Sequence, residues 1–356
     1  SKWADIYVFV KFNQTDYIHP DVKENVRLIS IPIQRKISPL RDLLAFFILL
    51  KKIYAIRPNC IISATPKAGL LSQLSAFLLM IKTRVHIFTG QVWVNKKGKL
   101  RFLLKNMDKL IGTFTTMNLV DGSAQQKFLV QERVLNYQKS RVTGYGSVSG
   151  VDLKKFKYSK ESRIELRSKY NLEESALVLI YLGRIDNDKG INDLVKAFKN
   201  YILPTHKNSH LFIVGYPEDN NLISSLMSAK EILGRHLQLI GPTLNPEKYL
   251  SFADIFCLPS YREGLNVTLL EAAACELLCV STDIYGTHDA LIDEISGLKY
   301  KPKDIKQMAD QICRIIEDKE LAQMLKINAL KRVRKYFDSK IVSELFDKFI
   351  FEILNR

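Results

Sequence analysis

Residues 177–201 read LVLIYLGRIDNDKGINDLVKAFKNY: an apolar run, a loop bounded by glycines and an amphipathic helix, in that order. An unbroken apolar run predicts a strand that is covered on both faces, and the apolar spacing after it predicts a helix. A strand, a loop and a helix in this order form the βα unit of a parallel sheet. This unit decides the fold class, because similar units precede and follow it.

The same alternation runs through both halves of the chain. In the second half it predicts strands at 177–182, 211–214, 237–240, 255–258 and 278–281, and helices at 191–201, 222–233, 266–275 and 305–316. In the first half it predicts strands at 6–10, 26–31, 60–63, 85–88 and 142–143, and helices at 40–56, 68–81 and 100–111. We therefore expect a doubly wound domain in the second half and another α/β domain in the first, which suits a chain of 356 residues.

A stretch rich in glycine and serine, GYGSVSG at 144–150, separates the two halves and is the best candidate for a linker. We expect a first domain at 1–150, a second at 151–340 and a terminal segment at 341–356. A cleft between two such domains is the default position for a ligand site.

The excess positive charge is confined to the first half. Residues 1–150 hold 23 Lys and Arg against 8 Asp and Glu, a balance of +15 within a total of +16. We therefore expect an anionic partner for the first domain. Nucleic acid, a membrane surface and a phosphorylated acceptor all remain candidates.

Composition narrows the class of protein. A chain that is 47% hydrophobic and 25% charged is typical of a folded protein. The longest apolar run, 43–50, has eight residues, against about 20 for a membrane-spanning helix. No cleavable signal is predicted, so a cytoplasmic location is expected. The cysteines are scattered, without a Cys-x-x-Cys pair, and are predicted to be reduced core residues: Cys60, Cys257, Cys275, Cys279 and Cys313.

Two loops carry candidate chemistry. In GRIDNDKG at 183–190, Arg184 and Lys189 follow a strand at the edge where open α/β sheets bind ligands, and both side chains suit a diphosphate. The alternative is that they are ordinary solvated charges.

The second loop lies in PSYREGLNVTLLEAAAC at 259–275, which follows the strand IFCL. Asn266 can cap a helix whose unpaired backbone N–H groups would form an anion site, at Gly264, Leu265, Asn266 and Val267. The Glu271 carboxylate could accept hydrogen bonds from two hydroxyl groups of a sugar ring. Glu263 would lie near the carbon of the ligand that reacts. The alternative is an amphipathic helix with two solvent-facing glutamates.

Together these motifs resemble the donor half of the retaining glycosyltransferase family 4. The resemblance rests on Gly183-Arg184 with Lys189-Gly190, on Glu263 and Glu271 in Glu-x7-Glu spacing, and on Thr282-Asp283 with Gly286. In the first half, ATPKAGLL at 64–71, FTGQVW at 88–93 and GSVSGVDLKKF at 146–156 are similar to bacterial members that build capsule, O-antigen and related surface glycans. The resemblance covers nearly the whole chain.

The resemblance implies a GT-B fold, in which two Rossmann-like domains face each other across a cleft. The N-terminal domain would take the acceptor, the C-terminal domain would take a UDP-sugar, and a last helix at 343–354 would cross back onto the first domain. By the same resemblance, Arg184 and Lys189 would bind the donor diphosphate, Glu271 the ribose and Glu263 the transferred hexose or N-acetylhexosamine. The phosphate cradle would be completed by Gly183 and the backbone of Gly264, Leu265, Asn266 and Val267.

Family members retain the anomeric configuration and use no metal ion, so no cofactor is expected, even though Asp186 and Asp188 have Asp-x-Asp spacing. The implied mechanism is a front-face substitution. Arg184 and Lys189 would stabilise the departing diphosphate, and a β-phosphate oxygen would take the proton of the acceptor hydroxyl.

The sequence departs from the family at three places. Thr89 stands where many members have a histidine, and His86 is interpreted as structural. Glu276, Leu277 and Leu278 replace the small residues that usually follow the second-glutamate helix. The first strand and Gly-rich loop, expected before residue 4, are not matched.

Two segments of the first half are candidates for contact with an anionic membrane surface. One is 96–110, where Lys96, Lys97, Lys99, Arg101, Lys105 and Lys109 interleave with apolar residues; the other is 40–57. The alternative is a solvated helix face. Because related enzymes use acceptors linked to polyprenyl diphosphate, we expect a peripheral enzyme on the inner face of the membrane. Acceptor-side residues would be Thr89, Gly90 and Lys67.

Two rival functions remain. A UDP-N-acetylglucosamine 2-epimerase has the same fold and would convert the donor without an acceptor. A binding protein for nucleic acid would use the basic half, but the chain shows no basic and aromatic stripe of the kind that nucleic-acid modules have.

Overall fold

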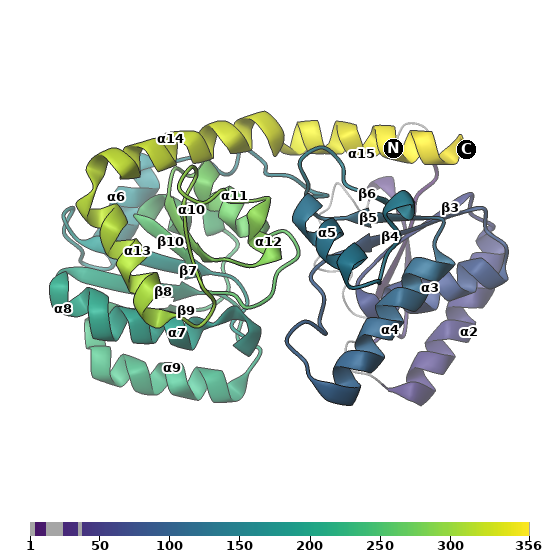
Figure 1. Ribbon diagram of the computed structural model, residues 1–356, viewed down its shortest axis with the longest axis horizontal. Helices are drawn as coiled ribbons and strands as arrows, with labels where there is room; N and C mark the ends of the chain where they lie inside the picture. Colours follow the sequence, from purple (N-terminus) through teal and green to yellow (C-terminus); the bar gives the residue numbers. More distant parts are fainter. Residues whose placement is uncertain (1–3, 12–23, 35–37, 356) are drawn as a thin grey trace.

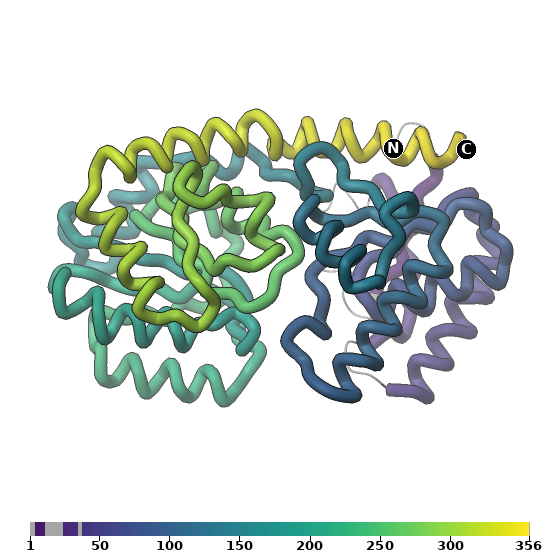
Figure 2. Tube along the Cα trace, in the orientation of Figure 1, coloured from purple at the N-terminus to yellow at the C-terminus, as the bar shows by residue number. Residues whose placement is uncertain are grey.

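The computed structural model describes residues 4–11, 24–34 and 38–355. Two α/β domains lie side by side, and the chain ends in a helix that runs from the second domain back over the first (Figures 1 and 2). The predicted architecture of two Rossmann-like α/β domains is confirmed. The region before Ala4, where the family has its first strand and Gly-rich loop, lies outside the described residues.

The C-terminal domain is built on a six-stranded parallel sheet in the order β12-β11-β10-β7-β8-β9. Its strands are β7 Leu177–Leu182, β8 Ser209–Val214, β9 Leu237–Ile240, β10 Ile255–Leu258, β11 Leu278–Thr282 and β12 Leu298–Tyr300. This is the strand order of Rossmann folds, and the direction of winding reverses between β7 and β10. The two candidate loops leave these two strands.

Helices cover both faces of this sheet and share one apolar core with it. They are α6 Lys160–Lys169, α7 Ile191–Ala197, α8 Leu203–Thr205, α9 Asn220–Leu233, α10 Pro246–Phe252, α11 Val267–Ala274, α12 Tyr285–His288, α13 Ile305–Glu317 and α14 Lys319–Tyr336. β12 was not predicted, because it has three residues and its middle residue, Lys299, is a charged side chain buried near Asp283.

The N-terminal domain holds a four-stranded parallel sheet in the order β3-β4-β5-β6, and a two-stranded parallel sheet of β1 and β2. The strands are β1 Tyr7–Lys11, β2 Arg27–Ile31, β3 Cys60–Ala64, β4 Thr83–Phe88, β5 Met117–Val120 and β6 Ser140–Arg141. The helices are α2 Pro39–Ile56, α3 Pro66–Leu78, α4 Gly98–Phe114 and α5 Ser123–Gln131.

Three sequence predictions fail in this domain. The strand predicted at 142–143 is wrong, because β6 lies two residues earlier. β5 was missed because it is short and buries a polar residue, Asn118. α5 was missed because it buries Gln125 and Gln126, so its buried face is not apolar. Burial of glutamine breaks the pattern on which helix prediction depends.

The last helix, α15 Ser339–Leu354, packs on the N-terminal sheet, where the resemblance places it. Phe349, Ile350 and Ile353 form a cluster with Val85 of β4 and Leu119 of β5. The two connections between the domains are bonded to each other. The Val151 N–H donates to the Phe337 carbonyl over 2.7 Å, and the Ser339 N–H donates to the Val151 carbonyl over 2.9 Å.

The cysteines are all free thiols. Cys257, Cys275 and Cys279 are buried as predicted, whereas Cys60 and Cys313 are half-buried. The turn after α11 forms despite its unusual residues, because Glu276 adopts a left-handed conformation with φ of +63°. Its N–H donates to the Ala273 carbonyl over 3.1 Å.

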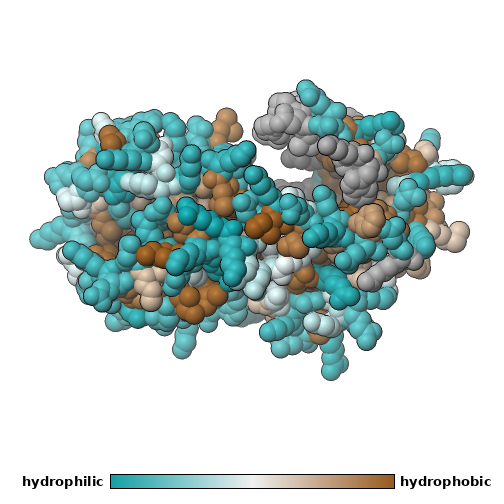
Figure 3. Space-filling model, turned by 90° about the horizontal axis from the view of Figure 1, so that it is seen from above, coloured by the Kyte–Doolittle hydropathy of each residue, from teal (hydrophilic) through white to brown (hydrophobic). Residues whose placement is uncertain are grey.

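Seen from above, both halves present mainly hydrophilic surface with small hydrophobic groups, and the outline is hollowed where the halves meet (Figure 3). Over residues 4–11, 24–34 and 38–355, no helix has both the length and the apolar character needed to cross a bilayer.

Candidate functional site

The two candidate loops meet at the carboxyl edge of the C-terminal sheet, where β7 and β10 are neighbours. Gly190 has a left-handed φ of +64°, and a Cβ there would lie 2.2 Å from the Pro259 carbonyl oxygen. Only glycine allows the loops to approach so closely. The reversal point of a doubly wound sheet is where such folds bind ligands.

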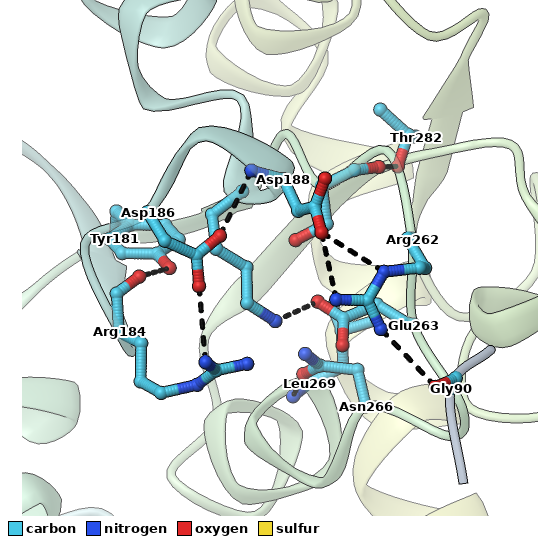
Figure 4. Close-up of polar contacts among 12 residues, drawn as sticks. Gly90, Tyr181, Arg184, Asp186, Asp188, Arg262, Glu263, Asn266, Leu269 and Thr282 are labelled. Carbon is cyan, nitrogen blue, oxygen red and sulfur yellow. Dashed lines mark hydrogen bonds and ion pairs between the residues drawn. The ribbon is translucent and has the colours of Figure 1, made fainter. Parts of the chain in front are cut away.

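Lys189 and Glu263 form an ion pair at this junction. Figure 4 shows Glu263 among the other polar side chains of the two loops. The Lys189 Nζ lies 2.6 Å from the Glu263 Oε1, and the two side chains are only 13% and 10% exposed. The alternative of two solvent-facing glutamates therefore does not hold for Glu263. Burying an ion pair costs free energy, because both charges leave water, and only close contact and further hydrogen bonds offset this cost.

Arg184 is held differently from Lys189. Its guanidinium lies 2.9 Å from Glu218 and 3.3 Å from Asp186, and its side chain is 43% exposed. Its backbone carbonyl accepts a hydrogen bond of 2.6 Å from the Tyr181 hydroxyl group. The side chain therefore remains partly open to solvent while its backbone is fixed.

A third cation, Arg262, links the domains. It donates to the Asp188 Oδ2 from Nη2 over 2.8 Å and from Nε over 3.1 Å, and its Nη1 donates to the Gly90 carbonyl of the N-terminal domain over 3.2 Å. From that domain, the Asn95 side-chain amide donates to the other Asp188 oxygen over 3.3 Å. Both guanidinium nitrogens that reach Asp188 donate to one carboxylate oxygen, and both hydrogen bonds are charge-assisted.

The site carries no excess of positive charge, because four carboxylates face three cations. The cations Arg184, Lys189 and Arg262 are paired with the carboxylates Asp186, Asp188, Glu218 and Glu263. A diphosphate would therefore have to share the cations with carboxylates that already hold them. The basic groups anticipated from the sequence are present, but they are not free charges.

The entry to α11 has the predicted cap. The Asn266 side chain accepts a hydrogen bond of 2.9 Å from the Leu269 N–H. The amides of Gly264, Leu265, Asn266 and Val267 lie at this end, but they are not all open toward the cleft. The Leu265 N–H lies close enough to the carboxyl group of Asp121, which comes from the N-terminal domain, to lower its pKa.

Glu271 lies on α11 and is half-buried. Burial raises the pKa of its carboxyl group to about 7, and the nearby positive charge of Lys155 lowers it. A carboxyl group that is neutral over part of the physiological range is typical of a ligand site. Its assignment to a ribose rests on the resemblance.

The acceptor-side candidates lie at the carboxyl edge of the N-terminal sheet. The Thr89 carbonyl accepts a hydrogen bond from the Gln125 side chain over 2.5 Å. Lys67, in the first turn of α3, lies 2.7 Å from Asp42. The residue that precedes this helix, Thr65, has φ of +66°, which is a strained conformation for a β-branched residue.

Gly90 and Gly264 bring the two backbones into contact across the cleft. A Cβ at Gly90 would lie 2.9 Å from the Gly264 nitrogen, and a Cβ at Gly264 would lie 2.7 Å from the Gly90 nitrogen. Gly286 packs against the same loop, since a Cβ there would lie 2.4 Å from the Glu263 carbonyl oxygen. The Glu263 loop is thus enclosed by backbone from both domains.

His86 is a buried residue beneath α3, as interpreted from the sequence. Its Nδ1 lies 2.8 Å from the Ser63 Oγ, and burial lowers its pKa to about 3. Among the described residues, no three His, Cys, Asp or Glu side chains gather as a metal site would require. Asp186 and Asp188 point to Arg184 and Arg262, respectively.

Several residues of the site were not predicted. Glu218, Arg262 and Asp121 lacked a recognisable motif role, although the REG triplet placed Arg262 beside Glu263. Tyr285 also crosses the cleft: its ring stacks on Phe128 with centroids 4.4 Å apart, and its hydroxyl donates to the Gln91 side chain over 2.9 Å. Only a known arrangement of the domains could have identified these contacts.

Residues 162–332 match the family model described as "Glycosyl transferases group 1". The chain is also similar to the capsular polysaccharide biosynthesis glycosyltransferase CapM of Staphylococcus aureus, with 28% identity over 88% of this chain and 82% of that protein. It is 27% identical to the N,N'-diacetylbacillosaminyl-diphospho-undecaprenol alpha-1,3-N-acetylgalactosaminyltransferase of Campylobacter jejuni, over 96% of this chain and 90% of that one.

Among solved structures, the chain resembles Anabaena Alr3699/HepE in complex with UDP. The TM-score is 0.77 at 16% identity, over 93% of this chain and 88% of the other. A likeness at this level of identity establishes the fold, which is the GT-B arrangement predicted from the sequence.

Proposed function

Because residues 162–332 match the family model "Glycosyl transferases group 1", we propose that this chain is a retaining glycosyltransferase. It would move a hexose or N-acetylhexosamine from a UDP-sugar to a lipid-linked precursor of a surface polysaccharide. The observation that carries the proposal is the buried Lys189–Glu263 pair at the reversal point of the C-terminal sheet. It joins a cation suited to a diphosphate and a carboxylate suited to a sugar at the position where such sheets bind ligands.

The relatives support the choice of donor and acceptor. The name of the Campylobacter jejuni relative specifies an acceptor on diphospho-undecaprenol, and the Anabaena structure contains UDP. A nucleotide sugar and a polyprenyl diphosphate both carry a diphosphate. The cations of the site would bind the diphosphate of the nucleotide sugar, and the basic N-terminal domain would bind that of the polyprenyl acceptor.

In the proposed mechanism, the donor diphosphate takes over part of the hydrogen bonding that carboxylates now receive from Lys189 and Arg184. Both cations then stabilise the negative charge that grows on the leaving diphosphate. Glu263, released from Lys189, holds the transferred sugar, and Glu271 holds the ribose. The bond from the anomeric carbon to the diphosphate breaks as the acceptor oxygen attacks the same face, and the hydroxyl proton passes to the leaving β-phosphate oxygen.

Metal independence is part of this proposal. Arg184, Lys189 and the amides at the start of α11 would supply the charge stabilisation that a divalent ion supplies elsewhere. The test is transfer in the presence of EDTA. Activity that is lost with EDTA and restored by Mg²⁺ or Mn²⁺ would contradict it.

The donor experiment uses a panel of UDP-sugars and GDP-sugars with a synthetic polyprenyl-diphosphate saccharide as acceptor. We expect transfer from a UDP-sugar, with the α-anomeric configuration kept in the product as seen by NMR. A product of inverted configuration would refute the retaining mechanism. Conversion of the sugar by the enzyme without acceptor would instead favour the epimerase.

We also propose that the N-terminal domain binds an anionic membrane surface as a peripheral protein on the inner face of the membrane. Helices α2 and α4, which both pack against α3, expose apolar side chains beside exposed lysines. The exposed apolar residues are Leu40, Leu43, Leu44, Phe47 and Tyr54 on α2, and Leu100, Phe102, Leu103 and Leu110 on α4. Such a surface combines insertion with attraction to anionic lipid.

Not every basic residue of this surface is available. Arg101 and Lys105 pair with Glu132 over 3.1 Å and 2.5 Å, and both lie over the ring of Trp93. Lys51 and Lys52 are exposed on α2, so exchanging both for glutamate should weaken binding to vesicles that contain anionic lipid. Binding that is insensitive to salt and to lipid charge would contradict the electrostatic contribution.

A further inference from the structure

One carboxylate of the N-terminal domain reaches into the donor-side loop. Asp121 follows β5 and is 7% exposed. A Cβ built on Gly264 would lie 2.7 Å from the Asp121 Oδ2, and the neighbouring Leu265 N–H lies close enough to lower the pKa of this carboxyl group. The Asp121 side chain of the N-terminal domain therefore lies beside the backbone amides of Gly264 and Leu265 in the C-terminal domain.

The position of Asp121 is fixed by its own domain. Its N–H donates to the Phe88 carbonyl over 3.3 Å and to the Gln125 side chain over 3.1 Å. Its carbonyl accepts from the Ser147 N–H over 2.7 Å. The end of β4, the helix α5 and the linker thus hold the backbone of this one residue in the N-terminal domain.

The loop that Asp121 contacts carries Glu263. From the C-terminal side, Lys189 holds the Glu263 carboxylate over 2.6 Å and Gly286 packs against its backbone. From the N-terminal side, Asp121 and the Gly90 backbone hold residues 264 and 265. Both domains must be in contact before this loop is held on both sides.

We propose that Asp121 is a positioning residue that holds the Glu263 loop in place when the two domains close. Closure of the N-terminal domain would thereby fix the position of the sugar-binding carboxylate. The inference rests on the proposed function for the role of Glu263. Burial raises the pKa of Asp121 to about 7, while the Leu265 N–H lowers it, so the contact favours the ionised form.

A second carboxylate provides a matched control. Asp289 of the C-terminal domain accepts a hydrogen bond of 2.9 Å from the Ala124 N–H at the start of α5. This contact likewise joins a carboxylate of one domain to the backbone of the other domain. Asp289 does not contact Glu263, Gly264 or Leu265 in any hydrogen bond described for it. Its loss should weaken closure without acting on the Glu263 loop.

The first test measures hydrogen–deuterium exchange of the unliganded full-length protein in a peptide that covers 262–269. In Asp121→Ala, exchange at Leu265 should rise about tenfold or more, as expected when a buried amide loses a charged acceptor beside it. In Asp289→Ala it should change less than about twofold, and in Asp121→Asn, whose amide oxygen can still accept, most of the protection should return. Equal exchange in Asp121→Ala and the parent, or an equal rise in both alanine variants, would overturn the proposal.

The second test is kinetic. Asp121→Ala should lower kcat by about tenfold or more and change the donor KM by less than about threefold, because it misplaces Glu263 and leaves the donor ligands intact. Added to Glu263→Gln, it should cause little further loss; independent, multiplying losses would refute positioning through Glu263. If the parent transfers no sugar from any donor, the proposed function fails, while the exchange experiment still decides the contact.

Discussion

The contact between Gly90 and Gly264 leads to a quantitative prediction for Gly90→Ala. The new Cβ would lie 2.9 Å from the Gly264 nitrogen and 3.0 Å from the Glu263 carbonyl carbon, whereas ordinary contact begins at 3.4 Å. Both atoms belong to backbone and cannot rotate away, so the domains must separate by several tenths of an ångström. Overpacking of this kind costs about 1–3 kcal/mol, which corresponds to a closure constant about 5- to 150-fold smaller.

We therefore expect kcat/KM for sugar transfer to fall by about ten- to a hundredfold in Gly90→Ala. Donor affinity measured by calorimetry without acceptor should stay within about twofold, because the substituted residue belongs to the other domain. The control is Gly241→Ala, since a Cβ there meets no atom within 4 Å and its φ is not left-handed. Unchanged kinetics in Gly90→Ala, or an equal loss in the control, would refute the steric argument.

Three further predictions concern single side chains. Glu263→Gln should lower kcat by about a hundredfold with the fold retained, as seen by circular dichroism; parent-like turnover would contradict its role. The pKa of Glu271 is raised to about 7, so donor affinity should fall about tenfold from pH 8 to pH 6 as the carboxylate is protonated, and calorimetry of Glu271→Gln should show no such dependence. Burial raises the pKa of Asp108 to about 6, while its bond to Trp93 lowers it. The stability that this group contributes is therefore present below pH 4 and is lost as the pH rises through about 6. In urea unfolding, the free energy of unfolding of Asp108→Asn should exceed that of the parent by about 1–3 kcal/mol at pH 8 and by little at pH 4. An equal difference at pH 8 and pH 4 would contradict this.

The central part of the donor site follows from the sequence. The strands at 177–182 and 255–258 are continuous apolar runs, so their first and last residues were predicted correctly. The carboxyl ends of parallel strands meet at one edge of the sheet. That rule alone brings Lys189 near Glu263. The cap by Asn266 follows from local chemistry in the same way.

The cross-domain contacts could not be predicted, because they depend on how two separately folded units meet. Asp121 follows a strand of four residues that the hydrophobic pattern did not reveal. Glu218 reaches Arg184 from the end of a different strand, 34 residues away along the chain. Nothing in the local spacing of these residues indicates their partners, and the charge balance of the site changes once they are included.

The two connections between the domains, at Val151 and at Phe337 to Ser339, form hydrogen bonds with each other. Gly150 beside them has a left-handed φ of +64°, and a Cβ there would lie 2.7 Å from the Ser339 Cα. Because the two connections are bonded to each other, sliding of one domain past the other would break these hydrogen bonds, whereas rotation of the domains about this junction need not. Opening of the domains should therefore separate the Gly90 and Gly264 backbones while the bonded connections beside Gly150 stay in place.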